Sequence, residues 1–394
     1  MINTPNANRL HIGIFGKTNS GKSSFINFIT NQNIALVSDI KGTTTDPVYK
    51  AMEIQGIGPC VFIDTAGFDD LSELGERRIE KTNLVIEKTD FAIMLFSDEN
   101  IESEKVWIKN LKDKNIPILY VINKCDILKN IDSIKNIIYK EFNENAITIS
   151  SLEKTGFEKL KDEIIRCIPK DFGSESITGS LVKEDDVVLL VMPQDIQAPK
   201  GRLILPQVQT IRDLLDNKCI VISCTTDKIN NALTSLKNPP KLIITDSQAF
   251  KEVYEIKPKE SNITSFSVLL GAYKGDIKEF IKGAKAIDSL NNSSKVLILE
   301  ACTHAPLEED IGRVKIPKML RKRYGEKIEV DIVSGADIPK DLSKYNIIIH
   351  CGACMFNRKH VISRIEKAKA QGVPITNYGV VLAKLCGILD KVDY

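Results

Sequence analysis

The segment His11-Ile-Gly-Ile-Phe15 runs directly into Gly16-Lys-Thr-Asn-Ser-Gly-Lys-Ser23, and Ser24-Phe-Ile-Asn-Phe-Ile29 follows. The first run has the composition of a buried strand, and the last has the pattern of a helix. A glycine-rich segment of this spacing between a strand and a helix is a phosphate-binding loop, whose backbone amides and helix N-terminus present positive dipoles to phosphate oxygens. The stretch therefore predicts a nucleotide-binding α/β domain at the start of the chain.

The residues of this loop have separate expected roles. Gly16 and Gly21 let the backbone close round the phosphates. Lys22 is expected to reach the β and γ phosphates, and the hydroxyl of Ser23 is expected to bind Mg2+. The nucleotide-binding set predicted from the loop is Gly16, Asn19, Ser20, Gly21, Lys22, Ser23 and Ser24.

Two further segments follow in the order that a GTPase requires. Gly42-Thr-Thr-Thr-Asp46 can offer a second hydroxyl to the magnesium, from Thr44. In Val61-Phe-Ile-Asp-Thr-Ala-Gly67, Asp64 ends a strand and can hold the ion, while the Gly67 amide senses the γ-phosphate. The residues expected to carry the hydrolysis are Lys22, Thr44, Asp64 and Gly67.

A third segment predicts which base the bound nucleotide carries. The apolar run 116–122 is followed by Asn123-Lys-Cys-Asp126. The carboxylate of Asp126 can accept hydrogen bonds from both the N1–H and the exocyclic amine of guanine, a pairing that adenine cannot reproduce. Alone, this segment could equally be a polar surface turn. Its place after the other motifs favours guanine. The base-binding residues predicted here are Asn123, Lys124, Asp126, Ser150, Ser151 and Leu152, the last three following another strand.

Cysteine and histidine gather at two places near the other end of the chain, in Ala301-Cys-Thr-His304 and in His350-Cys-Gly-Ala-Cys354. Each group directly follows an apolar run, 295–300 or 345–349, which predicts that both lie where strands end. Ligands of open parallel sheets bind beyond the carboxyl ends of the strands, so the two groups can converge on one metal or cluster site.

Three interpretations of these thiols stay open at this point. Buried cysteines can be small apolar core residues. Cysteine and histidine at this spacing also suit a tetrahedral zinc ion. The third, which we favour, is a 4Fe-4S cluster held by the thiolates of Cys302, Cys351 and Cys354, with the fourth iron left to an exchangeable ligand or to the candidates His304 and His350.

Composition narrows the class of protein. The 394 residues contain 54 basic and 52 acidic side chains, and no long basic run is present, so nucleic acid is not an expected partner. No apolar run approaches the ~20 residues needed to span a bilayer, so we expect no membrane segment and a cytoplasmic protein. Thiols stay reduced there, so the remaining cysteines are expected to be structural and free of disulfides.

The pattern of apolar runs predicts an α/β chain of three domains: a P-loop GTPase domain over 1–170, a βαβ domain over 171–262 and a doubly wound domain that carries the cysteines over 263–394. The middle domain shows no catalytic residues, which favours a role in assembly. Expected strands there and beyond are 187–192, 219–223, 242–245, 295–300, 328–333, 345–349 and 374–377. His360 is expected on the surface, at the start of a helix.

The first domain resembles the TrmE-Era branch of GTPases, in the Gly42–Asp46 form of its switch and in the Asp64-Thr-Ala-Gly-Phe68 form of its magnesium segment. Phe68 stands where Ras-like proteins carry a water-orienting glutamine, and an apolar side chain cannot do that work. The resemblance implies that an asparagine at the position of Asn19 helps to hold K+, which supplies the missing positive charge. A loop asparagine that bonds its own backbone is the alternative.

A GTPase of this branch followed by Cys302-x-His304 and His350-Cys351-x-x-Cys354 resembles the FeFe-hydrogenase maturation GTPases, the HydF family, over essentially the whole chain. The resemblance implies a homodimeric scaffold and carrier that binds a 4Fe-4S cluster, receives a diiron precursor from two radical-SAM maturases and delivers it to the hydrogenase. It also implies that the middle domain dimerises. The alternative is a GTPase of RNA modification or ribosome assembly with a structural zinc site.

Overall fold

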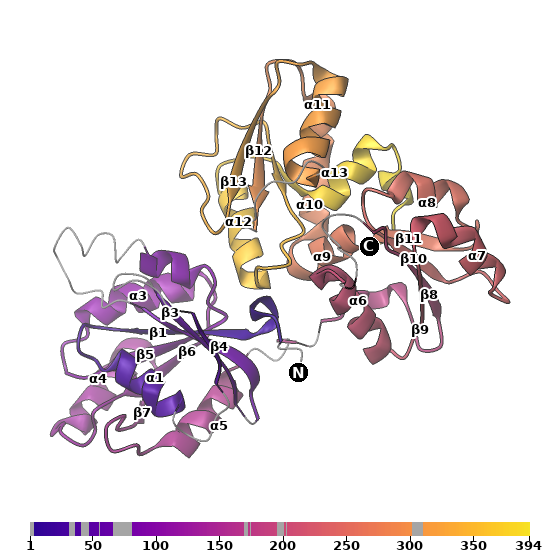
Figure 1. The fold of residues 1–394 in the computed structure, drawn as a ribbon. Helices are drawn as coiled ribbons and strands as arrows, with labels where there is room; N and C mark the ends of the chain where they lie inside the picture. Colours follow the sequence, from indigo (N-terminus) through magenta and orange to yellow (C-terminus); the bar gives the residue numbers. More distant parts are fainter. Residues whose placement is uncertain are drawn as a thin grey trace. The chain divides into compact units, whose positions relative to one another are not determined.

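A computed structural model describes residues 4–30, 36–40, 47–54, 56–65, 81–168, 172–173, 175–194, 201, 203–301 and 310–394. The chain forms two compact units, Met1–Ser174 and Glu175–Tyr394 (Figure 1). No helix in these described ranges is long and apolar enough to cross a bilayer.

The first unit is built on a seven-stranded sheet in the order β2-β3-β4-β1-β5-β6-β7. The β2–β3 and β3–β4 pairs are antiparallel, and the other neighbours are parallel. Central strands of a parallel sheet are buried on both faces, which is why β1 and β5 are buried along their whole length. The strands are β1 (Leu10–Gly16), β2 (Leu36–Ile40), β3 (Val48–Ile54), β4 (Gly58–Asp64), β5 (Phe91–Phe96), β6 (Ile118–Ile122) and β7 (Ile147–Thr148).

Helices cover both faces of this sheet. The helices are α1 (Lys22–Thr30), α3 (Glu102–Asp113), α4 (Ile131–Phe142) and α5 (Phe157–Cys167). Alternate side chains of β1 point to opposite faces, so Ile14 packs in one core with α1 and α5, while Phe15 packs in another with α3 and α4. This arrangement confirms the predicted P-loop α/β fold.

The second unit contains two four-stranded sheets, and every strand pair in them is parallel. The orders are β11-β10-β8-β9 and β13-β12-β14-β15. The strands are β8 (Val187–Val191), β9 (Ile220–Cys224), β10 (Leu242–Thr245), β11 (Asn262–Ser265), β12 (Lys295–Glu300), β13 (Glu329–Ser334), β14 (Ile347–His350) and β15 (Ile375–Asn377). The further α/β sheets expected in the middle and at the end of the chain are thus present.

The helices of this unit alternate with its strands. They are α6 (Leu205–Asp216), α7 (Ile229–Thr234), α8 (Phe250–Ile256), α9 (Phe266–Lys274), α10 (Ile277–Ala284), α11 (Ile316–Tyr324), α12 (Arg358–Ala370) and α13 (Tyr378–Leu385). Helix α10 is followed by a 3-10 turn, Lys285–Ser289. The expectation that His360 lies on the surface is wrong: its side chain is buried in α12, with its ring 4.2 Å from that of Phe356.

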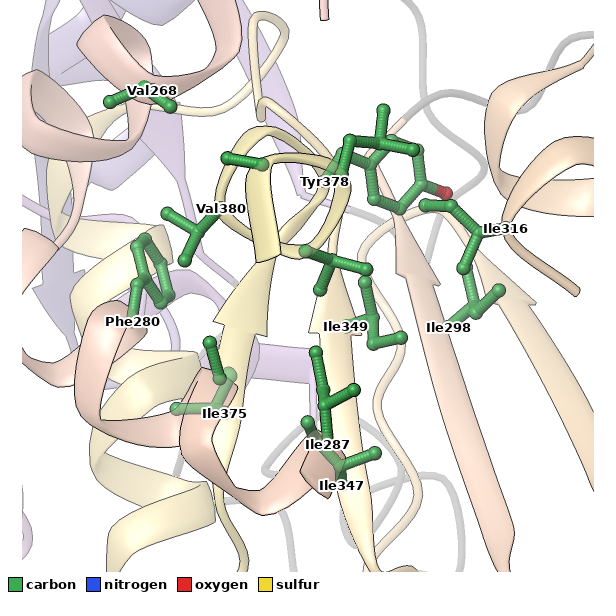
Figure 2. Close-up of a cluster of buried hydrophobic side chains, with 14 of the residues drawn as sticks. Val268, Phe280, Ile287, Ile298, Ile316, Ile347, Ile349, Ile375, Tyr378 and Val380 are labelled. Carbon is green, nitrogen blue, oxygen red and sulfur yellow. The ribbon is translucent and has the colours of Figure 1, made fainter. Parts of the chain in front are cut away.

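One hydrophobic core runs through both sheets of the second unit. It joins Leu189 of β8 and Ile243 of β10 to Ile298 of β12 and Ile349 of β14. Figure 2 shows the part of it nearest the last sheet, where Val268 and Phe280 face Val380 and Ile375. The two sheets therefore share their packing.

Candidate functional site

The phosphate-binding loop joins β1 to α1. Lys22 Nζ donates to the carbonyl oxygens of Gly16 and Lys17, at 2.7 Å each, so its ammonium lies over the loop. Asn19 has a φ of 63°, in the left-handed region that asparagine tolerates better than most residues. The loop therefore curls back over itself, with the lysine and the first amides of α1 placed for an anion.

Ser23 and Asp64 come together from α1 and β4. Ser23 Oγ donates to Asp64 Oδ2 at 2.8 Å. Burial raises the pKa of the Asp64 carboxyl, and the Ser23 hydrogen bond and the Lys22 charge act in the opposite direction. A hydroxyl and a partly desolvated carboxylate at this position suit a magnesium ion, which would favour the charged carboxylate.

Asn123 ties the base-binding segment to the phosphate loop. Its Nδ2 donates to the Ser20 carbonyl oxygen at 3.0 Å, and its Oδ1 accepts from the Ser151 amide (3.1 Å) and the Ser151 hydroxyl (2.9 Å). Gly21 has a φ of 91°, and a Cβ built there would lie 2.4 Å from Asn123 Nδ2. The approach of the two segments thus requires glycine at this position.

Asp126 and Ser150 form the outer part of the base-binding segment. Ser150 Oγ donates to Asp126 Oδ1 at 2.5 Å and accepts from the Glu153 amide at 3.0 Å. Lys124 has a φ of 62°, and the Leu152 side chain is exposed. The carboxylate is therefore held in a defined orientation at an exposed position, as the predicted contact with guanine requires.

Lys17 is a part of this site that the sequence did not single out. Its Nζ lies 3.0 Å from Asp98 Oδ1 and 3.7 Å from Glu104 Oε2, and it also donates to the Asn100 carbonyl oxygen. These contacts hold the phosphate loop against the segment after β5. Burial raises the pKa of Glu104 to about 7.

The second site is the loop Cys351–Asn357 between β14 and α12. Cys351 Sγ accepts from the backbone amides of Ala301 (3.1 Å) and Ala353 (3.4 Å). Ala353 has a φ of 53°, which turns its amide toward the sulfur. Burial raises the pKa of the Cys351 thiol to about 11, and the two amides act against that rise. Amide donors of this kind favour sulfur in its anionic, metal-binding form.

His350 has a partner on each ring nitrogen. Nδ1 lies 2.8 Å from the Cys351 carbonyl oxygen, and Nε2 lies 3.0 Å from Arg364 Nη1. Because a guanidinium can only donate, Nε2 accepts and Nδ1 carries the hydrogen that it donates to the carbonyl. Burial, followed by the Arg364 charge, lowers the pKa of His350 to about 3, so its ring is neutral.

Lys274 and Glu300 complete the surroundings of this loop, and no motif pointed to either. Lys274 Nζ donates to the carbonyl oxygens of Ala353 (3.3 Å), Cys354 (3.1 Å) and Phe356 (2.9 Å). Burial lowers the pKa of Lys274 to about 8. Glu300, at the end of β12, accepts from Arg313 Nε (3.0 Å) and Nη2 (2.8 Å).

Several predicted site residues lie outside the part of the chain that the structure describes. They are Thr44, Gly67, Phe68, Cys302 and His304. Within the described residues, no three histidine, cysteine or acidic side chains are grouped so as to hold a metal ion. The described loop brings Cys351 and Cys354 together, and the third expected thiolate belongs to the undescribed segment after Ala301.

Three family models match the chain. Residues 11–124 match a 50S ribosome-binding GTPase domain, 177–275 match the hydrogen maturase F dimerization domain, and 278–392 match the hydrogen maturase F tetramerization domain. The last two cover more than half of the chain between them. The first unit is accordingly a GTPase domain, and the second unit carries domains for oligomer formation.

Similar proteins match less than half of the chain. The tRNA modification GTPase MnmE of Clostridioides difficile (strain 630) is 37% identical over 176 residues, 43% of this chain and 36% of that protein. MnmE of Flavobacterium johnsoniae is 39% identical over 191 residues, 46% of this chain and 39% of that protein. The chain thus spans well under half the length of these relatives.

Solved structures show a weaker likeness. The crystal structure of an Era variant of Aquifex aeolicus bound to GDP.AlF4- has 18% identity and a TM-score of 0.35, over 55% of this chain and 92% of that one. The G domain of the Thermotoga maritima FeoB iron transporter has 20% identity and a TM-score of 0.33, over 41% of this chain and 99% of that one.

Proposed function

Because the chain belongs to the HydF family of hydrogenase maturation GTPases, we propose that it is a scaffold and carrier in assembly of the FeFe-hydrogenase H-cluster. In this proposal it binds a 4Fe-4S cluster with one exchangeable site, accepts a diiron precursor there and transfers it to the apo-hydrogenase. The precursor is cargo, and the cluster is the resident cofactor.

The observation that carries the cluster assignment is the environment of Cys351 Sγ. Two backbone amides donate to this sulfur in a loop whose carbonyls rest on the buried ammonium of Lys274. Such donors fit a thiolate that holds iron better than a neutral core thiol, which needs neither. Cys302, Cys351 and Cys354 would hold the cluster, which supplies one iron without a cysteine ligand.

The fourth ligand is proposed to be exchangeable or to come from His304. His350 is the weaker of the two histidine candidates, because Arg364 occupies its Nε2 and the Cys351 carbonyl occupies its Nδ1. Ligation by His350 would first have to break one of these bonds.

GTP with Mg2+ is the proposed nucleotide, and K+ the proposed activator. Ser23 and Asp64 would hold the magnesium with Thr44, and Asn19 would help to hold the potassium. Lys22 and the Gly67 amide would stabilise charge on the γ-phosphate during hydrolysis.

The proposed partners are the apo-hydrogenase, the two radical-SAM maturases and a second copy of this chain, all in the cytoplasm. We propose neither a nucleic-acid partner nor a membrane. An RNA-modification or ribosome-assembly GTPase with structural zinc is not favoured, because the tRNA modification GTPases match less than half of this chain. The matches over 177–392 are to hydrogen maturase F domains.

The test is anaerobic reconstitution of the full chain with iron and sulfide. The parent protein should take up iron and turn brown, whereas Cys302→Ser, Cys351→Ser and Cys354→Ser should each lose the cluster and hydrogenase activation and keep GTP hydrolysis. Cys386→Ser is the matched control, since that thiol lies outside the loop in the same unit. Full iron content and hydrogenase activation in all three loop variants would refute the proposal.

A further inference from the structure

Lys274 places a positive charge directly beneath the loop that carries Cys351 and Cys354. Only 1% of its surface is exposed, and its Nζ donates to three carbonyl oxygens of that loop. The three carbonyl oxygens match the three N–H groups of the ammonium form, whereas a neutral amine has only two. The loop therefore rests on a fixed, buried cation.

A buried ammonium is costly unless negative charge opposes it. In the described part of the chain, negative charge on the Cys354 and Cys351 sulfurs would raise the pKa of Lys274, against the burial that lowers it. Carbonyl dipoles satisfy its hydrogen bonds but leave its charge uncompensated. The balancing charge is thus expected on the sulfur side of the loop.

The cation cannot easily move away from the loop, because α9 is held at both ends. Arg358 Nη1 donates to the carbonyl oxygens of Tyr273 (2.8 Å) and Gly275 (3.0 Å), on either side of Lys274. Asn377 Nδ2 donates to the Ser267 carbonyl oxygen at 2.9 Å, near the start of the helix. These bonds join α9 to the beginning of α12 and the end of β15.

We infer that Lys274 is a positioning residue and a fixed counter-cation for an iron–sulfur cluster bound at this loop, and that it raises the reduction potential of the cluster. The inference rests on the proposed cluster-scaffold function. Reduction adds one negative charge to the cluster, and a positive charge held nearby in a poorly screened interior favours the reduced state.

Three variants of the full chain separate the effect of the Lys274 charge from the effect of its side-chain shape. Lys274→Gln removes the charge and keeps a hydrogen-bond donor, Lys274→Arg keeps the charge, and Lys278→Gln makes the same change at an exposed position of α10. The measurements are iron per chain, the midpoint potential from a titration followed by electron paramagnetic resonance, and hydrogen exchange of residues 350–357 in the iron-free protein.

In Lys274→Gln, the ratio of reduced to oxidised cluster at a given potential should fall at least tenfold, which is a shift of about 59 mV for a one-electron couple. Lys274→Arg should retain the parent potential, and so should Lys278→Gln. Loop amides of the iron-free protein should exchange at least tenfold faster in Lys274→Gln than in the parent, because the shorter glutamine has two N–H groups and cannot satisfy all three carbonyl oxygens.

The results of these measurements distinguish a failure of the counter-cation role from a failure of the proposed function. A parent chain that takes up no cluster would refute the proposed function and the counter-cation role. A bound cluster whose potential is the same in Lys274→Gln and the parent, or a tenfold shift in Lys274→Arg, would overturn the counter-cation role and leave the scaffold function standing. Unchanged loop exchange in iron-free Lys274→Gln would overturn the positioning role. If Lys274→Gln does not fold, Lys274→Met, which also removes the charge and keeps an unbranched side chain of similar size, takes its place in the potential measurement, and an unchanged potential in it overturns the counter-cation role.

Discussion

Arg364 Nη1 lies 3.0 Å from His350 Nε2, and this contact makes Nε2 the accepting nitrogen of the histidine ring. The arginine is almost fully buried in α12 and lies over the Phe356 ring, 4.7 Å from its centroid. It also donates to the carbonyl oxygens of Gly335 and Asp337. The imidazole is therefore one acceptor among several that a buried guanidinium requires.

His350→Ala is expected to lower the free energy of unfolding by about 3 kcal/mol, because it leaves a buried charged donor without its acceptor. The spectrum of the cluster iron that lacks a cysteine ligand should stay as in the parent. Chemical denaturation and electron paramagnetic resonance check the two parts. His350→Gln, which retains an acceptor, is the matched control. A changed iron spectrum in both variants would make His350 a ligand after all.

Gly21→Ala is expected to weaken GTP binding about tenfold or more. The new Cβ would lie 2.4 Å from Asn123 Nδ2, so the side chain has to leave the Ser20 carbonyl oxygen. A lost bond to a buried group costs about 1–3 kcal/mol, and 1.4 kcal/mol is a factor of ten in affinity. Gly58→Ala controls for backbone strain, since Gly58 has a φ of 89° with open space around it. Equal nucleotide affinity in the two variants would contradict the clash.

Asp126→Asn should shift preference from GTP to xanthosine triphosphate. The asparagine amide donates where the carboxylate accepted, and xanthine presents a carbonyl where guanine has its amine. Competition binding with the two nucleotides measures the change. Asp132→Asn makes the same substitution at a carboxylate whose side chain is 94% exposed and should change nothing. A parent chain that binds ATP as tightly as GTP would defeat the guanine assignment.

GTP hydrolysis should be faster in potassium chloride than in sodium or lithium chloride of the same ionic strength, by about tenfold, because one positive charge is missing from the site. Asn19→Gly should remove the difference. Glycine adopts the φ of 63° found at this position without strain, so only the side chain is lost. Equal parent rates in the three salts would argue against a potassium site.

Glu104→Gln should flatten the dependence of stability on pH. Burial raises the pKa of Glu104 from 4.5 to about 7, so the folded state holds its proton more tightly than the unfolded state. The contribution of Glu104 to the free energy of unfolding is therefore greatest below pH 4.5 and falls as the pH rises to about 7. In thermal unfolding experiments between pH 4.5 and 7, the stability of the Glu104→Gln variant should not show this decrease. Glu102→Gln, whose side chain is 76% exposed in the parent, should behave like the parent.

The motifs and apolar runs predicted much of the fold because each of their signals is local. The phosphate loop, the strands near 295–300 and 345–349 and the guanine segment appear where expected. β11 was missed because Asn262–Ser265 holds a single apolar residue among polar ones, yet it pairs with β10 and completes the middle sheet.

Lys274 and Arg364 could not have been found in the same way. Lys274 meets its acceptor in Cys354 across 80 residues of sequence, and that acceptor is a backbone carbonyl, which any residue type provides. Arg364 likewise meets backbone oxygens and a buried imidazole. Contacts of this kind depend on the packing of α9 and α12 against each other and against β15, and no periodic pattern encodes them.

The hydrophobic core that joins Leu189 to Ile349 has a genetic consequence. A substitution that loosens the packing beneath the cysteine loop also loosens the sheet of the dimerization domain, because one core serves both. Temperature-sensitive alleles that map to this core are thus expected to behave as assembly mutants. Second-site suppressors of such alleles should then arise on the opposite sheet as readily as beside the original change.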